Sequence, residues 1–226
     1  MIGVFDSGVG GLTALAELRR LLPRTDMIYL ADREHAPYGT KSEEEILSLA
    51  ENCIKRLITA GAERILIACC TASTLHSRLT EGARRIATPI IAPAARAAQR
   101  VSRGRIAVIA TEATVRSHAF RRAILGEGRC EVAEYATQEL VAMVESGASD
   151  RKPLTLGERS TLSRLLAPIK ASRADTLILG CTHFPHLRGH IASMLPEVKL
   201  ISPSREGALE IARSTEDRGG GRTIFL

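Results

Sequence analysis

Two cysteines occupy equivalent places in the chain, each at the predicted end of an apolar strand. Cys69 follows the run 64–68 and Cys181 follows the run 175–180, and each precedes a predicted helix. Unpaired backbone N–H groups and the helix dipole favour a thiolate at such a turn, so we predict a lowered pKa for both thiols. An isolated cysteine of this kind is more often a small buried apolar residue. Two cysteines in matching positions favour a catalytic interpretation instead.

Thiols on the two sides of a cleft predict the inversion of a stereocentre. A thiolate on one face of a carbon removes a proton, while a thiol on the other face delivers one. The sequence has neither a phosphate-binding loop nor the spacing of a dinucleotide fingerprint, and lysine is scarce near both turns. We therefore predict a reaction that uses no cofactor.

Asp6 and Ser7 end the first predicted strand and should open into the same cleft. The glycine-rich segment 8–11 follows them, and we expect its backbone amides to be exposed to an anion. Asp6 has two interpretations. It orients the first thiol or a substrate ammonium, or it is an ordinary helix cap.

Tyr38 and His183 are two further candidates for the cleft wall. Tyr38 lies in the Pro/Gly turn 36–40 and is interpreted either as a polar wall or as an apolar plug. His183 follows Cys181 by two residues and is either a proton relay for that thiol or a capping, solvent-facing histidine.

A zinc site is the alternative use of these side chains. Neither flank has the usual spacing of two to four residues between ligands. Two of the cysteines are adjacent and would point to different sides if strand geometry continued through them. We expect no metal, although five potential ligands gather near the cleft: Cys69, Cys70, Cys181, His183 and His186.

The elements that must position these residues indicate an α/β fold. Short apolar, β-branched runs alternate with longer helical patterns, which is typical of βαβ units and mainly parallel sheets. Ser42 and Glu45 form a capping-box pattern for a helix that Gly61 should end. The segment 138–170 predicts two helices with a break between them. The predicted strands are 2–6, 27–31, 64–69, 90–92, 105–110, 130–135, 175–180 and 199–202.

The chain also resembles itself at long range. The run that ends in Cys69 matches the run that ends in Cys181, 112 residues later, and segment 2–5 matches segment 106–109 at an offset of 104. Such a repeat predicts two pseudo-symmetric α/β halves that face a central cleft. We expect residues 1–97 and 203–226 to form the first domain and residues 98–202 the second.

Composition limits the classes of function. The 226 residues carry 31 Lys+Arg and 25 Asp+Glu, a net charge of +6, but the basic residues are scattered and aromatic residues make up only 3%. This pattern argues against nucleic-acid binding. The apolar runs are too short to span a membrane, and the N-terminus has no secretory pattern. Five cysteines without a CxxC pair indicate reduced thiols, and we expect a cytoplasmic protein.

Four motifs in this order resemble those of glutamate racemases, members of the aspartate/glutamate racemase family. The resemblance runs over nearly the whole chain. The motifs are IGVFDSGVGGL at 2–12, PYGTKS at 37–42, ACCTAS at 68–73 and LGCTHFP at 179–185.

The resemblance implies a cofactor-independent racemase that interconverts L- and D-glutamate, the latter for bacterial peptidoglycan and hence the cell wall. It implies that Cys69 and Cys181 are the acid/base thiols, that Asp6 assists Cys69, and that Glu145 and His183 assist Cys181. It also implies a homodimer. The implied substrate-binding residues are Asp6, Ser7, Tyr38, Gly39, Cys70, Thr71, Thr114, Thr182 and His183.

One departure from the family bears on substrate binding. Cys70 stands where the family has asparagine, and a thiol donates and accepts hydrogen bonds less well than an amide. An aspartate racemase, or a catalytically weakened member that acts as a binding protein, therefore remains an alternative.

Overall fold

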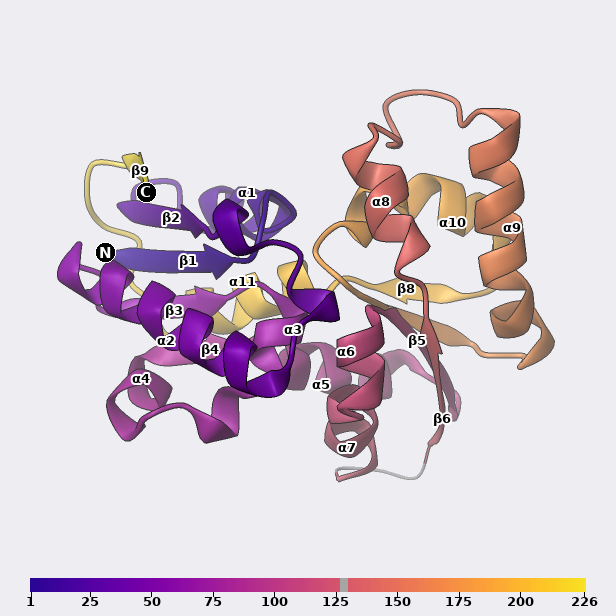
Figure 1. Cartoon of the computed structure of the whole chain (residues 1–226), viewed down its shortest axis with the longest axis horizontal. Helices are drawn as coiled ribbons and strands as arrows, with labels where there is room; N and C mark the ends of the chain where they lie inside the picture. Colours follow the sequence, from indigo (N-terminus) through magenta and orange to yellow (C-terminus); the bar gives the residue numbers. More distant parts are fainter. Residues whose placement is uncertain (127–129) are drawn as a thin grey trace.

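The computed structural model describes residues 1–126 and 130–226, and its strands form two parallel sheets. The first sheet has the order β4-β3-β1-β2-β9 and the second the order β6-β5-β7-β8. Figure 1 shows the two sheets side by side, with helices covering them. The strands are β1 (Ile2–Asp6), β2 (Met27–Ala31), β3 (Arg64–Ile67), β4 (Ala87–Pro89), β5 (Arg105–Ala110), β6 (Glu131–Ala136), β7 (Thr176–Gly180), β8 (Lys199–Ile201) and β9 (Thr223–Phe225).

The strand orders confirm the internal repeat. Reading the second sheet backwards gives β8-β7-β5-β6, which corresponds strand for strand to β4-β3-β1-β2. Cys69 follows β3 and Cys181 follows β7, so the two cysteines occupy equivalent ends. The predicted α/β class with mainly parallel sheets is therefore confirmed.

Two strands differ from the prediction. The strand expected at 90–92 is β4 at Ala87–Pro89, and Ile91 instead begins a helix. Pro89 cannot donate to a ladder and ends this edge strand, whereas Pro93 lies in the first turn of a helix, where no N–H partner is needed. The strand β9 was not predicted, because three residues carry too short a pattern.

The helices follow the predicted boundaries closely. The helix after Ser42 has its capping box, and the segment after Gln138 holds two helices, α8 and α9, with a break between them. The helices are α1 (Leu12–Leu21), α2 (Glu43–Thr59), α3 (Cys70–Ser73), α4 (Glu81–Ile86), α5 (Ile91–Val101), α6 (Glu112–Arg116), α7 (Ala119–Leu125), α8 (Glu139–Glu145), α9 (Leu156–Ala171), α10 (Arg188–Met194) and α11 (Pro203–Arg213).

The hydrophobic core consists of three clusters, and the central one belongs to both sheets. It gathers side chains of α1, α5 and α11 with residues from both β1 and β5. Successive residues of β5 face opposite sides of the sheet. Val108 faces the central cluster, and Ile109 faces the cluster under α8 and α9. The expected domain boundary at residue 97 lies inside α5, so the two halves share this layer.

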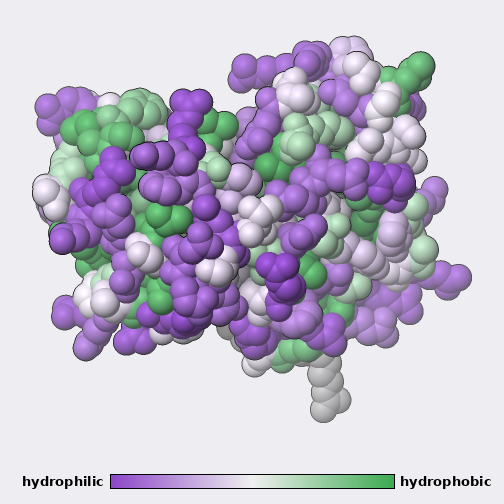
Figure 2. Space-filling model, in the orientation of Figure 1, coloured by the Kyte–Doolittle hydropathy of each residue, from purple (hydrophilic) through white to green (hydrophobic). Residues whose placement is uncertain are grey.

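The carboxyl ends of the strands of both halves meet at the interface between the halves, which is called the seam below. The residues after β1, β3, β5 and β7 lie there, because parallel strands present their carboxyl ends at one edge. Figure 2 shows an indentation between the lobes in the same view. None of the helices in the described part of the chain has the length and apolar character needed to cross a bilayer.

The capping box of α2 yields a stability prediction. Ser42 Oγ accepts a hydrogen bond from the Glu45 backbone N–H, so Ser42→Ala should lower the free energy of unfolding by about 1 kcal/mol. Ser48→Ala, an exposed position inside the same helix, serves as the control and should cost nothing. Urea unfolding of the two variants measures the difference, and equal stabilities would contradict the capping role.

Candidate active site

One small cavity at the seam gathers most of the residues that the sequence singled out. Its volume is about 30 Å³, enough for one or two water molecules. The segment 36–39 closes it from the first half, and α8 borders it from the second. Its lining is Ser7, Gly8, Ala36, Pro37, Tyr38, Gly39, Cys69, Cys70, Thr71, Thr111, Gln138, Val141, Glu145, Cys181, Thr182 and His183.

Cys69 lies at the N-cap of the short helix α3. Its Sγ accepts from the backbone N–H of Ala72 at 3.5 Å, and its thiol donates to Ser7 Oγ at 3.4 Å. Burial raises the pKa of Cys69 to about 11, and the nearby charge of Asp6 acts in the same direction. The predicted lowering of its pKa is therefore wrong for this closed form, because loss of solvation outweighs the helix N-terminus.

Cys181 begins a row of titratable groups that leads out of the cavity. Its Sγ lies 3.6 Å from Nδ1 of His183, and Nε2 of His183 lies 3.4 Å from Oε1 of Glu145. The last contact has ion-pair distance without hydrogen-bond geometry. Glu145 is half exposed, with 53% of its side chain accessible, so the row connects the thiol with solvent. Burial raises the pKa of Cys181 as well, against the sequence prediction.

Asp6 is fully buried and binds the backbone of its own half. Its Oδ2 accepts from the N–H groups of Gly8 at 3.1 Å and Gly11 at 2.9 Å, and its Oδ1 accepts from Thr182 Oγ1 at 3.3 Å. These two amides are not exposed to an external anion as predicted, because the Asp6 carboxylate already occupies them. Burial raises the pKa of Asp6, while the charge of His183 opposes that rise. Asp6 does not line the cavity wall and acts on the thiols through its charge.

The glycine-rich turn also allows the halves to approach closely. A Cβ at Gly10 would lie 2.4 Å from Oγ1 of Thr182 and 2.9 Å from Nδ1 of His183. Real side chains do not tolerate such contacts, so the absence of a side chain at Gly10 lets the turn reach the residues after β7.

Tyr38 is held in the wall by a residue that the sequence analysis missed. Its hydroxyl donates to Oδ2 of Asp32 at 2.6 Å, while Oδ1 of Asp32 lies 2.8 Å from Nδ1 of His35. The ring packs against Phe5 with 6.2 Å between the centroids, so Tyr38 is both a plug and a polar wall. Asp32 directly follows β2, as Asp6 ends β1, and this placement at a strand end could have identified it.

Three threonine hydroxyls join the two halves beside the cavity. Thr71 Oγ1 lies 3.1 Å from the hydroxyls of both Thr111 and Thr114, which are 2.9 Å from each other. Thr71 and Thr111 line the cavity, whereas Thr114 lies behind them. Thr111 was missed by the sequence analysis, although it directly follows β5.

Cys70 lines the same cavity as Cys69, and the two side chains also point to different sides, as expected: Cys69 packs into the cluster under α2 and Cys70 into the central cluster. Although β3 ends at Ile67 and Cys70 begins α3, the alternation between the two clusters continues through this pair. Burial raises the pKa of Cys70 well above its ordinary value, and the neighbouring thiols Cys181 and Cys69 add to the effect.

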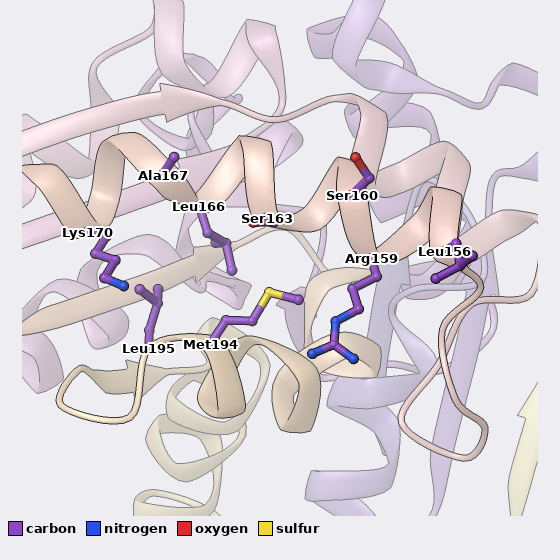
Figure 3. A pocket seen from close by; sticks show the side chains of 9 residues that line it. All are labelled: Leu156, Arg159, Ser160, Ser163, Leu166, Ala167, Lys170, Met194 and Leu195. Carbon is purple, nitrogen blue, oxygen red and sulfur yellow. The ribbon is translucent and has the colours of Figure 1, made fainter.

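The described residues form no metal site, and a second hollow lies away from the seam. Among residues 1–126 and 130–226, no three or more His, Cys, Asp or Glu side chains are grouped to hold a metal ion. A larger hollow of about 500 Å³ lies between α9 and α10 (Figure 3). Its lining includes Arg159, Lys170 and Met194 but no thiol, imidazole or carboxyl group, so it lacks the paired thiols of the seam cavity.

Comparisons with known proteins agree with this geometry. The family model of the Asp/Glu/Hydantoin racemases matches residues 11–211. The glutamate racemase of Desulforudis audaxviator is 44% identical over 209 residues, which cover 90% of this chain and 74% of the relative. That of Gloeobacter violaceus is 43% identical and covers 94% of this chain and 79% of the relative.

Solved structures show the same arrangement. Glutamate racemase isoform RacE1 from Bacillus anthracis has a TM-score of 0.87 at 32% identity and covers all of this chain and 86% of its own. Glutamate racemase from Francisella tularensis, solved in complex with D-glutamate, has a TM-score of 0.87 at 31% identity, covering 99% and 86%. The aspartate racemase of Picrophilus torridus shares the fold at 18% identity and a TM-score of 0.70.

The raised pKa of Cys69 predicts a pH dependence of the ligand-free protein. Cys69 should remain a thiol at neutral pH and ionise around pH 11, instead of near its ordinary value of 9.0. Because the folded-state pKa is the higher one, the stability it contributes is present below pH 9.0 and is lost as the pH rises through about 11. The difference in thiolate ultraviolet absorbance between the wild type and Cys69→Ala measures the titration. A thiolate signal already present at neutral pH would contradict this assignment.

Proposed function

Because the chain belongs to the Asp/Glu/Hydantoin racemase family, we propose that Cys69 and Cys181 interconvert L- and D-glutamate by direct proton transfer, without a cofactor. The chain is an amino-acid racemase of the glutamate racemase type. The observation that carries the mechanism is that two thiols from equivalent strand ends of the two halves line one cavity.

The proposed reaction moves one proton off the substrate and one proton onto it. The thiolate of one cysteine takes the proton from the α-carbon and becomes a thiol. The thiol of the other cysteine gives its proton to the opposite face of the resulting carbanion and becomes a thiolate. The reverse reaction exchanges the two roles, so a single site serves both directions.

The substrate itself supplies the positive charge that favours a thiolate in the closed cavity. Burial and the charge of Asp6 both raise the pKa of Cys69. A substrate ammonium beside them places an opposite charge near the sulfur and favours the thiolate. Binding of an amino acid therefore activates the base, and the same negative charge on Asp6 attracts the ammonium.

We propose separate assistants for the two thiols. His183 and Glu145 exchange protons between Cys181 and solvent, a role that their separations of 3.6 and 3.4 Å support. Ser7, bonded to the Cys69 thiol, orients that group, and Asp6 influences it electrostatically. The proposed substrate-holding groups of the cavity wall are Ser7, Tyr38, Gly39, Cys70, Thr71, Thr182 and His183. Asp6 lies outside the wall and acts on the substrate ammonium through its charge, and Thr114 positions the hydroxyls of Thr71 and Thr111.

Substrate entry requires the halves to separate. A cavity of about 30 Å³ is too small for an amino acid with a carboxylate side chain. Next to the cavity the contacts between the halves include the hydroxyl bonds of Thr71 with Thr111 and Thr114, whereas farther away the halves share an apolar cluster. Water replaces such bonds at little net cost. We propose that residues 1–97 with 203–226 and residues 98–202 are the units that move, and that the shared layer around α5, which contains the boundary between them, stays packed.

We further propose that the enzyme works in the cytoplasm as a homodimer and supplies D-glutamate for peptidoglycan. The family resemblance supports the homodimer and the role in peptidoglycan, and the sequence pattern supports the location. Val9 and Leu12, whose side chains are exposed beside the site, are candidates for a surface between subunits. Sedimentation of the purified chain measures the oligomeric state.

The two-thiol mechanism predicts the effect of replacing either cysteine by serine. Cys69→Ser and Cys181→Ser should each lower kcat for glutamate by about 10²–10⁴-fold, because an alcohol is a much weaker acid than a thiol. Circular dichroism follows racemisation of L- and D-glutamate, with aspartate as the comparison substrate. The control is Cys53→Ser, a buried thiol of α2 outside the cavity. Substantial activity in either active-site variant would overturn the mechanism.

Replacing Cys70 by asparagine, the residue of the family, should improve the binding of glutamate. A thiol forms weaker hydrogen bonds than an amide, so Cys70→Asn should lower KM for glutamate by roughly threefold to tenfold. Steady-state kinetics in both directions measures the change. An unchanged or raised KM would show that Cys70 has a compensated role of its own.

A further inference from the structure

Gln138 places an unsatisfied acceptor in the active-site cavity. It lies at the N-cap of α8, and its side chain lines the cavity. Its Oε1 is buried and has no hydrogen-bond partner among the described residues. Buried polar atoms are nearly always paired, and leaving one unpaired costs free energy. A buried acceptor without a partner, on a residue that lines the cavity, is therefore suited to a donor that arrives with a ligand.

The position of Gln138 makes it part of the closed site. A Cβ at Gly39 would lie 2.9 Å from Gln138 Oε1, so the amide reaches the turn of the opposite half. Gly39 follows Tyr38, which is fixed in the cavity wall by Asp32. Closure of the two halves thus brings the Gln138 carbonyl to the same wall as the proposed substrate-holding groups.

The chemistry of the substrate identifies the donor. At neutral pH an acidic amino acid carries two carboxylates, which only accept hydrogen bonds, and one ammonium, which donates three. We propose that Gln138 is an additional substrate-binding residue whose side-chain carbonyl accepts a hydrogen bond from the α-ammonium. This inference rests on the proposed glutamate racemase function. Such a bond fixes the orientation of the α-carbon between the two thiols.

Two substitutions at this position test the proposal. Gln138→Met keeps the length of the side chain but removes the acceptor, and it should raise KM for glutamate about tenfold to a hundredfold with a smaller change in kcat. Gln138→Glu keeps an acceptor oxygen, and its KM should stay at or below that of the wild type. A wild-type KM in Gln138→Met would overturn the proposal. A larger loss in Gln138→Glu than in Gln138→Met would also overturn it, since the amide would then donate to a carboxylate.

A ligand without the ammonium separates binding from a merely structural role. Glutarate has both carboxylates but no amino group, so its inhibition constant should be equal for the wild type and Gln138→Met. An equal weakening of glutarate and glutamate would mean that the substitution disturbs the cavity as a whole, and would overturn the proposal. Glu139→Gln is the control, because that neighbouring side chain pairs with Arg164 outside the cavity.

The outcomes also distinguish this inference from the proposed function. A wild-type enzyme that does not racemise glutamate overturns the proposed function and this inference with it. An active wild type with an equally active Gln138→Met variant overturns this inference alone.

Discussion

The fully buried carboxylate of Asp6 is the constraint on which the seam depends. A carboxylate without solvent needs hydrogen-bond donors, and Asp6 obtains them from the backbone of Gly8 and Gly11 and from the hydroxyl of Thr182. The first two bonds fix the turn after β1, and the third joins that turn to the residues after β7. A single side chain thereby holds the ends of two equivalent halves in register.

The same burial sets the electrostatics of the cavity. Loss of solvation raises the pKa values of Asp6, Cys69, Cys70 and Cys181 together. Burial thus favours neutral thiols, which are poor bases. A zwitterion with an ammonium group reverses this balance for the sulfur near it. Closure of the cavity and formation of the thiolate are therefore linked. The closed cavity excludes water from the thiols, so at neutral pH a thiolate forms only when a substrate ammonium lies beside it.

The seam combines a shared apolar layer with replaceable polar contacts. The central cluster beneath α5 and α11 contains side chains from both sheets and keeps the halves joined. Near the cavity the contacts are mostly between small hydroxyls, such as those of Thr71, Thr111 and Thr114. Apolar burial is costly to undo, whereas hydroxyl bonds exchange readily with water. This division lets one edge of the seam open while the other remains packed.

Local patterns along the chain were enough to predict the elements that depend on them. Alternating apolar runs predicted the parallel α/β halves, the capping box at Ser42 predicted the start of α2, and the matching runs before Cys69 and Cys181 predicted equivalent strand ends. The strand at 90–92 was misplaced because its short apolar run also fits the first turn of α5. Local patterns are reliable when the element is long enough to repeat its period several times.

Properties that depend on distant segments became visible in the folded chain alone. The pKa of Cys69 rises because the two halves together exclude water from it, which no spacing along the chain expresses. Asp32, Thr111 and Gln138 enter the site through strand ends and a helix start that become neighbours only after folding. Solvation and hydrogen-bond satisfaction depend on contacts between residues far apart in sequence, so these properties are determined by the fold.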